Sequence, residues 1–290
     1  MNKFPVSENE PLAPRTTFRI GGAARFYAEP SDEIELVAFL RTARERGIRV
    51  LRLGGGSNLL VADEGVDALV LRLGSGFDRA TADDDDPTLL RVGAAMPLAK
   101  ALREAERRGL SGLEPWGAIP GTVGGAAAMN AGSPALGILD LAEEIRLVDA
   151  DGGTILRRGE WTYGYRDGGT GGRWVTEVAF RLTPDEPAEI REQTLEAALE
   201  KRVSQPLSER SAGCVFRNPP GHSAGRLLDQ AGLKGRCRGD AMVSAKHANF
   251  IVNRENATAA DVLGLADEMR EAVRRAHGVE LVFELTIWPA

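Results

Sequence analysis

The sequence predicts an α+β fold in which a cofactor-binding half precedes a basic C-terminal half. Strands and helices alternate in the first 75 residues, and a strand-rich stretch occupies the middle of the chain. Two glycine-rich segments interrupt this pattern, and the first directly follows a predicted strand. The last third combines helices with a strand of clean hydrophobic alternation.

The first part of the chain is predicted to form strands around one capped helix. Ser31 is expected to cap a helix that ends at Gly47, with Asp32 and Glu33 placed favourably for the helix dipole. The predicted strands here are residues 25–28, 48–53 and 68–73.

The middle of the chain is predicted to be rich in strands. Pro97 begins a helix that stops at Gly109. The acidic residues 83–86 are interpreted as a solvated connection without a metal role. The predicted strands are residues 89–92, 145–150, 154–156 and 174–182.

The C-terminal part is predicted to be dominated by a long capped helix. Thr258 and Asp261 form a pattern similar to a capping box, and Gly278 ends the helix. Its buried stripe is predicted to be Val262, Leu265, Ala266, Met269 and Val273. The other predicted elements are helices at 188–202 and 223–231 and strands at 248–252 and 279–287.

The composition is that of an ordinary globular protein. The 290 residues suffice for about two domains, and 43% of them are hydrophobic and 27% charged. A net charge of −6 argues against a nucleic-acid partner. We expect no signal peptide and no membrane partner, because no apolar run approaches about 20 residues. The two cysteines lack metal-ligand spacing, so we predict no metal site and a cytoplasmic location.

Charge is unevenly distributed along the chain. Residues 201–247 contain nine Lys or Arg against three acidic residues. This stretch is either a solvated basic face or a focused site for an anionic small molecule, and its glycines and prolines favour the second interpretation.

The two glycine-rich segments are candidates for anion binding. The first covers residues 53–60, and the second runs from Ile119 to Gly125 and on to Gly132. Consecutive glycines let backbone amides approach a bulky anion. Neither segment matches the Rossmann or P-loop pattern, and each alone is compatible with a plain turn. Together they can hold the two ends of an extended ligand such as a dinucleotide.

Three further residues are candidates for chemistry. Arg166 lies beside aromatic residues and a glycine turn, although an ion pair with Asp167 is an equally simple interpretation. Cys214 lies among small residues shortly before Arg217, but a lone cysteine is usually a small buried hydrophobe. Glu284 lies on the polar face of the last predicted strand, where a solvent-facing carboxylate is the simpler interpretation.

Seven short motifs occur in order along the chain. They are residues 16–22, 54–60, 121–125, 129–132, 164–166, 211–216 and 246–252. In this order they resemble the UDP-N-acetylenolpyruvoylglucosamine reductases, flavoenzymes that make UDP-N-acetylmuramate for peptidoglycan, from about residue 10 to residue 287. The short connection after Arg166 is similar to the family branch that lacks an extra tyrosine loop.

The resemblance implies an FAD-binding fold of the vanillyl-alcohol-oxidase (PCMH) type, followed by a C-terminal α+β substrate-binding domain. The implied domains are 1–203, with subdomains of about 1–75 and 76–203, and 204–290. The implied FAD is non-covalent, in agreement with the lack of His and Cys before Cys214. The implied FAD contacts are Leu53, Gly54, Gly55, Gly56, Ser57, Asn58, Leu59, Gly117, Ile119, Pro120, Gly121, Thr122, Gly124, Gly125, Asn130 and Gly132.

The resemblance also implies a reaction and its residues. NADPH reduces the flavin, and the enolpyruvyl ether of UDP-N-acetylglucosamine then takes the hydride at its methylene carbon. Arg166 and Glu284 match the family residues that stabilise the developing enolate, a role that needs preorganised charge. Cys214 stands where the family usually has serine as proton donor, and a thiol, with a reference pKa near 8.5, can also donate. Its cost is sensitivity to oxidation.

The implied substrate contacts are Tyr165, Arg217, Asn218 and Lys234, the last three near the UDP diphosphate. Arg236, Arg238 and Lys246 are expected to add to the positive electrostatic field around the substrate. The protein is expected to be a monomer. The alternatives are a sugar-lactone or alcohol oxidase of the same fold and a non-catalytic binding module.

Overall fold

The chain divides into two units, which the computed structural model describes over residues 5–133 and 135–289. Unit 1 contains the described residues up to Ser7, with Tyr27–Gly55 and Ala68–Glu200. Unit 2 contains Glu8–Phe26, Gly56–Asp67 and the described residues from Lys201 onward. Each unit therefore combines segments that lie far apart in the sequence. The domain limits of 1–203 and 204–290 stay a prediction.

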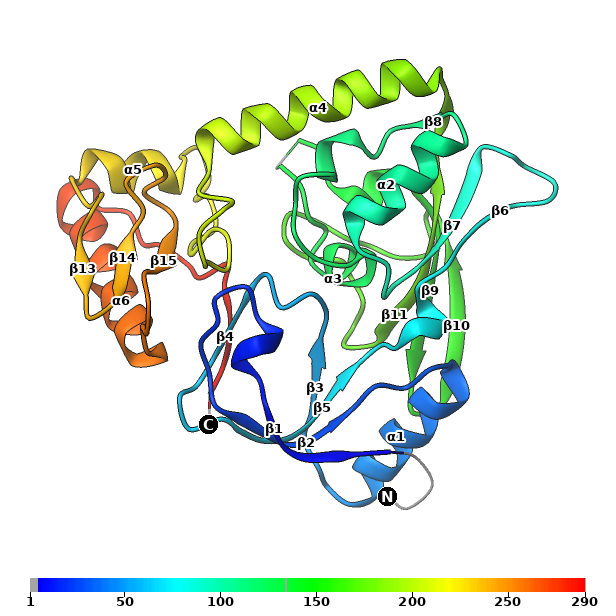
Figure 1. The fold of residues 1–290 in the computed structure, drawn as a ribbon, viewed down its shortest axis with the longest axis horizontal. Coiled ribbons are helices and arrows are strands. Elements are labelled where there is room, and N and C mark those ends of the chain that lie inside the picture. The colour runs from blue at the N-terminus through cyan, green and yellow to red at the C-terminus, as the bar shows by residue number, and fades with distance from the viewer. Residues whose placement is uncertain (1–4, 134, 290) are drawn as a thin grey trace. The chain divides into compact units, whose positions relative to one another are not determined.

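Figure 1 labels most of the helices and strands. The helices are α1 (Glu33–Glu45), α2 (Leu98–Arg107), α3 (Val123–Ala128), α4 (Pro187–Ser204), α5 (Ala224–Gln230) and α6 (Ala259–His277), with short 3-10 turns η1 (Ala13–Arg15), η2 (Ser75–Phe77), η3 (Glu114–Trp116) and η4 (Ile138–Leu141). The first eight strands are β1 (Ser7–Pro11), β2 (Ala23–Ala28), β3 (Val50–Leu53), β4 (Leu59–Val61), β5 (Val66–Arg72), β6 (Ala80–Ala82), β7 (Leu89–Gly93) and β8 (Leu110–Ser111). The others are β9 (Ala142–Asp149), β10 (Gly152–Arg157), β11 (Trp174–Arg181), β12 (Thr183–Pro184), β13 (Cys237–Arg238), β14 (Ala241–Val243), β15 (Ile251–Asn253) and β16 (Thr286–Trp288). No helix in the described part of the chain combines the length and apolarity needed to cross a membrane.

Unit 1 is organised around a five-stranded antiparallel sheet in the order β10-β9-β11-β7-β6. Side chains alternate along each strand, so one face of the sheet is apolar. Helices α2 and α3 cover this face (Figure 1), and their residues form one hydrophobic core with those of the strands. Among its fully buried members are Leu90, Val92, Ala105, Val123, Ile145, Val178 and Phe180.

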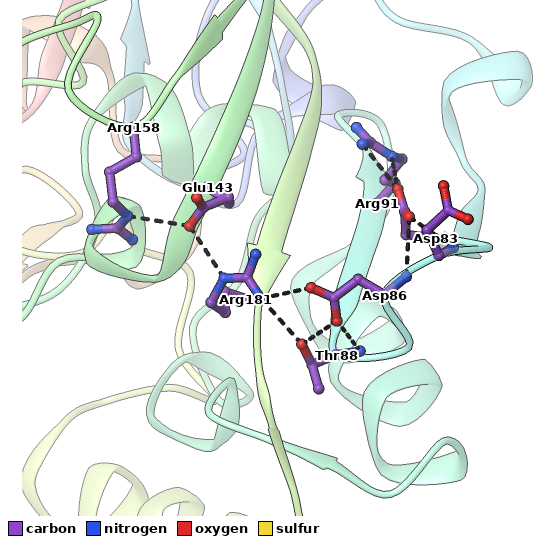
Figure 2. Close-up of polar contacts among 8 residues, drawn as sticks. Asp83, Asp86, Thr88, Arg91, Glu143, Arg158 and Arg181 are labelled. Atoms are coloured by element: carbon purple, nitrogen blue, oxygen red, sulfur yellow. Dashed lines mark hydrogen bonds and ion pairs between the residues drawn. The ribbon is translucent and has the colours of Figure 1, made fainter.

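The opposite side chains of the same strands are charged and form ion pairs (Figure 2). Arg181 on β11 contacts Asp86 at 2.8 Å and Glu143 on β9 at 3.3 Å, and Arg91 on β7 contacts Asp83 at 3.1 Å. The acidic connection at 83–86, predicted to be solvated, therefore has two of its aspartates fixed by arginines of the sheet. Charged pairs at this degree of exposure stabilise weakly, so they orient the loop more than they hold the sheet.

Helix α1 begins one residue later than expected. The carboxylate of Asp32 accepts from the backbone N–H of Glu35 at 2.8 Å and caps the helix. Ser31 instead donates to the Glu35 carboxylate from both its N–H and its hydroxyl. The prediction of Ser31 as the cap is wrong, because Asp32 is also a strong capping residue and lies one position closer to the helix.

Unit 2 has its own core, formed where α5 and α6 pack with the three-stranded sheet β13-β14-β15. The predicted capping box is confirmed, because Thr258 and Asp261 each accept a backbone hydrogen bond from the other. The predicted buried stripe of α6 and its end at Gly278 are also confirmed.

The C-terminal segment is less regular than the sequence suggests. Only β16 pairs in a ladder, parallel to β4 of the same unit, while Phe283 makes an isolated bridge to Phe216. The predicted alternation holds, since Leu281 and Leu285 are buried and Val282 is exposed. The predicted continuous strand 279–287 is wrong because this segment changes pairing partner on the way to β16. The strand expected at 248–252 is likewise shorter and later, at Ile251–Asn253.

Candidate active site

The two glycine-rich segments meet within unit 1. A Cβ on Gly55 would lie 2.7 Å from the Cα of Gly121, and a Cβ on Gly54 would lie 3.2 Å from the hydroxyl of Thr122. Side chains at Gly55 would therefore force the loops apart. The structure brings together the two loops that the sequence offered as halves of one anion site.

The second loop leads directly into α3. Thr122 caps this helix by accepting from the N–H of Gly125 at 3.3 Å. Gly124 donates to the carbonyl of Ala94 at 2.9 Å, and a Cβ there would lie 2.6 Å from the Ala94 side chain. A Cβ on Gly125 would come no closer than 3.4 Å to the Thr122 hydroxyl, so packing does not require a glycine there. Gly125 is thus free of the packing constraint that fixes Gly124.

The meeting point of these loops has the glycine-rich character that we expected for the pyrophosphate of a dinucleotide such as FAD. Four residues without side chains (Gly54, Gly55, Gly121 and Gly125) line the meeting point, which is the feature that lets backbone amides approach an anion. Like Gly55 and Gly124, two other predicted FAD contacts have a packing reason to be glycine: a Cβ on Gly117 would collide with Leu102, and one on Gly132 with the carbonyl of Leu136.

The rest of the predicted FAD contacts are divided between the units. Leu53 ends β3 in unit 1, and Ile119 and Pro120 precede Gly121 in that unit. Gly56, Ser57, Asn58 and Leu59 belong to unit 2. Gly56 has a φ of 65° and lies against the backbone of Arg15, where a side chain would collide.

Arg166 lies in unit 1 on a tight turn. Gly164 and Asp167 exchange backbone hydrogen bonds of 2.8 and 3.2 Å around Tyr165 and Arg166. Arg166 has a φ of 59°, a left-handed conformation that costs a non-glycine residue about 1–3 kcal/mol and persists only where the surroundings impose it. Its guanidinium lies 5.4 Å from the centre of the Tyr165 ring, within the range of a cation–π contact. The side chain of Asp167 accepts from Gly169 N at 2.9 Å.

Cys214 lies in unit 2 at the start of a buried strand-like segment. It bridges to Phe250, and Val215 donates to the carbonyl of Asn249 at 2.8 Å. The cysteine is half-buried, whereas Val215 and Phe216 after it are fully buried. This placement keeps the thiol at the edge of the core.

Glu284 is brought by the backbone next to Val215, the residue that follows Cys214. Its N–H donates to the carbonyl of Val215 at 2.8 Å, and its own carbonyl accepts from the Asn58 side chain at 3.0 Å. The residue is half-buried. Two of the three predicted catalytic residues therefore lie on adjacent segments of unit 2, and Arg166 belongs to unit 1.

Two residues that the sequence did not single out hold these segments in place. Asn249 accepts from Phe216 N at 3.0 Å and donates to Phe216 O at 2.8 Å, which fixes the chain beside Cys214. The Thr17 hydroxyl donates to the carbonyl of Ser211 at 2.6 Å, and Thr17 N donates to Gly56 O at 3.1 Å. The available signal in the sequence was an asparagine inside the apolar run 248–252, where a polar side chain needs hydrogen-bond partners.

Three of the four predicted substrate contacts, Arg217, Asn218 and Lys234, lie in unit 2, and two of them have local side-chain partners. Lys234 pairs with Asp229 at 2.9 Å, and the Asn218 side chain accepts from Ala224 N at the start of α5. Arg217 is exposed. Arg236 and Arg238, expected to add positive field, both pair with Glu268 on α6. No group of three or more His, Cys, Asp or Glu that could bind a metal occurs among residues 5–133 and 135–289.

Comparison with known proteins identifies relatives over nearly the whole chain. Residues 24–157 match the family model for an FAD binding domain, and residues 205–288 match that for a UDP-N-acetylenolpyruvoylglucosamine reductase C-terminal domain. UDP-N-acetylenolpyruvoylglucosamine reductase 2 of Symbiobacterium thermophilum is 45% identical, covering 98% of this chain and 92% of its own. The reductase of Moorella thermoacetica is also 45% identical, with coverage of 99% and 94%.

A solved structure agrees with this relationship. The UDP-N-acetylenolpyruvylglucosamine reductase of Thermus caldophilus superposes with a TM-score of 0.83 at 37% identity, covering 99% of both chains. An FAD-binding domain followed by this C-terminal domain defines a flavin-dependent oxidoreductase. More narrowly, the chain belongs to the UDP-N-acetylenolpyruvoylglucosamine reductase family. The family, the FAD-binding α+β fold and the FAD cofactor expected from the sequence are confirmed.

Proposed function

We propose that this protein reduces the enolpyruvyl ether of UDP-N-acetylglucosamine to UDP-N-acetylmuramate, with NADPH as the reductant. A hydride is added to the methylene carbon of the double bond and a proton to the adjacent carbon, while NADPH becomes NADP⁺. The membership in the reductase family carries this proposal. The product would serve peptidoglycan synthesis.

FAD, when bound, supplies the group that accepts a hydride from NADPH and passes it to the substrate. In this proposal the pyrophosphate of FAD is held by Gly54, Gly55, Gly121 and Gly125, where the two loops of unit 1 meet. Their lack of side chains supports this role, because amide donors can then approach the phosphates directly. The other FAD contacts expected from the sequence remain part of the proposal, except the side chain of Asn130, whose donor and acceptor atoms both have backbone partners.

Arg166, Glu284 and Cys214 are proposed to share the chemistry of the addition step. Adding a hydride to the double bond drives negative charge towards the substrate carboxylate, and the Arg166 guanidinium stabilises that charge. Glu284 orients the same end of the substrate. The Cys214 thiol then donates the proton to the adjacent carbon. The backbone link of Glu284 to Val215 supports a shared site for the last two residues.

The diphosphate of the substrate is assigned to Arg217, Asn218 and Lys234, with Tyr165 as a further substrate contact. Charge-assisted hydrogen bonds to phosphate are strong enough to place the sugar nucleotide. Lys234 pairs with Asp229 at 2.9 Å, and the further donors of its ammonium group are proposed to bind the phosphate. We also propose that the protein acts as a monomer in the cytoplasm, which size-exclusion chromatography with light scattering and cell fractionation would test.

The decisive experiment is an anaerobic assay of the FAD-loaded protein. We expect NADPH consumption to require UDP-N-acetylglucosamine enolpyruvate, and mass spectrometry to detect UDP-N-acetylmuramate in equal amount. Protein stripped of FAD is the control. If the enzyme reduced by NADPH were instead reoxidised rapidly by oxygen and slowly by the enolpyruvyl compound, the oxidase alternative would be correct. Binding of both ligands without turnover would indicate a binding module.

A further inference from the structure

The turn that carries Arg166 is held by one buried side chain. Asn130 donates from Nδ2 to the carbonyl oxygen of Gly164 at 3.0 Å. The same carbonyl accepts from the N–H of Asp167 at 3.2 Å. Asn130 therefore attaches at the point where the turn closes on itself, two residues before Arg166.

Asn130 is itself fixed in one orientation. Its side chain is buried, and its Oδ1 accepts from the N–H of Leu139 at 3.0 Å. A Cβ on Gly137 would collide with the amide group of Asn130, so the amide is packed on that side as well. Rotating the amide would place its NH₂ against an N–H and its oxygen against a carbonyl, so only one orientation satisfies both partners.

The second glycine loop and the Arg166 turn are connected through α3. The helix begins directly after Thr122 of the loop, and Asn130 follows shortly after its last residue, Ala128. Ala128 also contributes, because its carbonyl accepts from Gly168 N at 3.1 Å on the far side of the turn. Two contacts from the end of one helix thus hold both sides of the turn within unit 1.

We propose that Asn130 is a positioning residue for Arg166 and that its side chain does not contact FAD. The proposal rests on the catalytic role proposed above for Arg166. A non-glycine residue in the left-handed region stays there only when its surroundings impose it, and the bond from Asn130 to Gly164 is part of that constraint. Without this bond the turn relaxes and the guanidinium moves, and a displacement of about 1 Å lowers a catalysed rate on the order of a hundredfold.

The test uses Asn130→Asp, which keeps the size of the side chain and the acceptor for Leu139 but removes the amide donor to Gly164. Asn253→Asp is the matched control. Asn253 is also buried, donates to Phe18 O at 3.0 Å and accepts from Ala257 N at 3.0 Å, but it belongs to unit 2. Each substitution removes one buried amide donor, so Asn253→Asp shows the loss of stability that this change causes away from the Arg166 turn.

In anaerobic stopped-flow experiments, we expect Asn130→Asp to bind FAD and to be reduced by NADPH as the wild type is. Reoxidation by UDP-N-acetylglucosamine enolpyruvate should slow by about tenfold to a hundredfold. Asn253→Asp should lower thermal stability and leave both rates unchanged. Without substrate, hydrogen exchange in a peptide covering residues 163–169 should accelerate in Asn130→Asp and not in Asn253→Asp.

Loss of FAD from Asn130→Asp, or reoxidation at the wild-type rate, would overturn the proposal. Arg166→Ala separates this failure from a failure of the catalytic assignment: if Arg166→Ala is slow and Asn130→Asp is fast, only the positioning role is wrong. If both are fast, the role of Arg166 is wrong. Should Asn130→Asp fail to fold, a crystal structure of the wild-type holoenzyme decides, since an Asn130 amide bonded to FAD instead of Gly164 excludes the proposal.

Discussion

At the scale of single residues, the identity of the proton donor is the sharpest question. Cys214→Ser should retain substantial turnover, because a hydroxyl can occupy the same position and donate a proton. Cys214→Ala should slow reoxidation by the enolpyruvyl substrate by about a hundredfold or more, the usual contribution of a general acid. Stopped-flow measurement of both half-reactions checks this prediction.

The reductive half-reaction provides the internal control for Cys214. Reduction of bound FAD by NADPH needs no proton from this thiol, so it should persist in both variants. Cys237→Ala is a matched substitution of the other, exposed cysteine and should leave both half-reactions intact. An alanine variant at 214 that reoxidised at the wild-type rate would rule out proton donation by Cys214.

The sequence located the candidate catalytic residues but could not say what holds them. Asn130 and Asn58 lie in glycine-rich motifs, so both were interpreted as cofactor contacts. In the structure their amides donate to the backbone carbonyls of Gly164 and Glu284. Those partners lie 34 and 226 positions away, and no local pattern in a sequence specifies a hydrogen bond over such a separation.

At the scale of secondary-structure elements, the capping box of α6 gives a direct prediction. Thr258→Ala removes the hydroxyl that accepts from Asp261 N at 3.0 Å. We expect a loss of about 1 kcal/mol in the free energy of unfolding, measured by urea denaturation. Ser208→Ala, in an exposed turn, is the control and should change stability by no more than about 0.5 kcal/mol. Equal stability of the two variants would contradict the capping role.

The ion pair between α1 and the five-stranded sheet predicts a dependence on pH. The pKa of Glu33 is lowered chiefly because its carboxylate accepts hydrogen bonds from Arg146, one of them 2.7 Å long. Partial burial of the carboxylate opposes this shift. A carboxyl group whose pKa is lowered on folding stabilises the folded protein when the pH is above the usual carboxyl pKa of 4.5. This stabilisation is lost as the pH falls through the lowered pKa.

Glu33→Gln should therefore cost about 1 kcal/mol at neutral pH and flatten the loss of stability on acidification. Urea denaturation between neutral pH and acid checks this expectation. Asp151→Asn breaks the exposed pair with Arg44 and should have a smaller effect. If Glu33→Gln and the wild type lost stability in parallel below the usual carboxyl pKa, the ion pair would not be responsible.

Hydrophobic periodicity predicted the long elements well, because burial of one helix or strand face decides them. Helix α6 and strands β7, β9 and β11 all appear close to their expected positions. The failures have a common cause, which is competition between near-equivalent local choices. Asp32 and Ser31 are both suitable N-cap residues for α1, and Asp32 is the one that caps it. The segment before β16 forms an isolated bridge to Phe216 in place of a continuous strand ladder.

At the scale of the whole molecule, the protein should be stabilised by its cofactor. A ligand present at a hundredfold excess over its Kd adds about 2.7 kcal/mol to the free energy of unfolding. For a chain of this size we expect the Tm to rise by about 5 °C, measured by differential scanning calorimetry. Riboflavin lacks the pyrophosphate and should raise the Tm much less. Equal stabilisation by riboflavin would exclude the glycine loops as the pyrophosphate site.

The division into units was not predictable from local patterns. The FAD-binding and C-terminal halves were separated by sequence, but Glu8–Phe26 and Gly56–Asp67 group with residues that follow Lys201. This grouping arises from pairings such as β4 with β16 and from the Thr17 contact with Ser211. Such long-range contacts depend on complementary surfaces that exist only after folding.

The parallel pairing of β4 with β16 also constrains the order of events during synthesis. The segment of β4 begins next to Asn58, and its pairing segment begins next to Glu284, 226 positions later. Strand β4 therefore cannot pair until the ribosome has released the segment that follows Glu284. The antiparallel sheet of unit 1 is complete by Arg181 and can form on the nascent chain while translation continues. Until β16 has been synthesised, the apolar residues of β4 have no strand to pair with. Nascent chains stalled before β16 should therefore depend on chaperones.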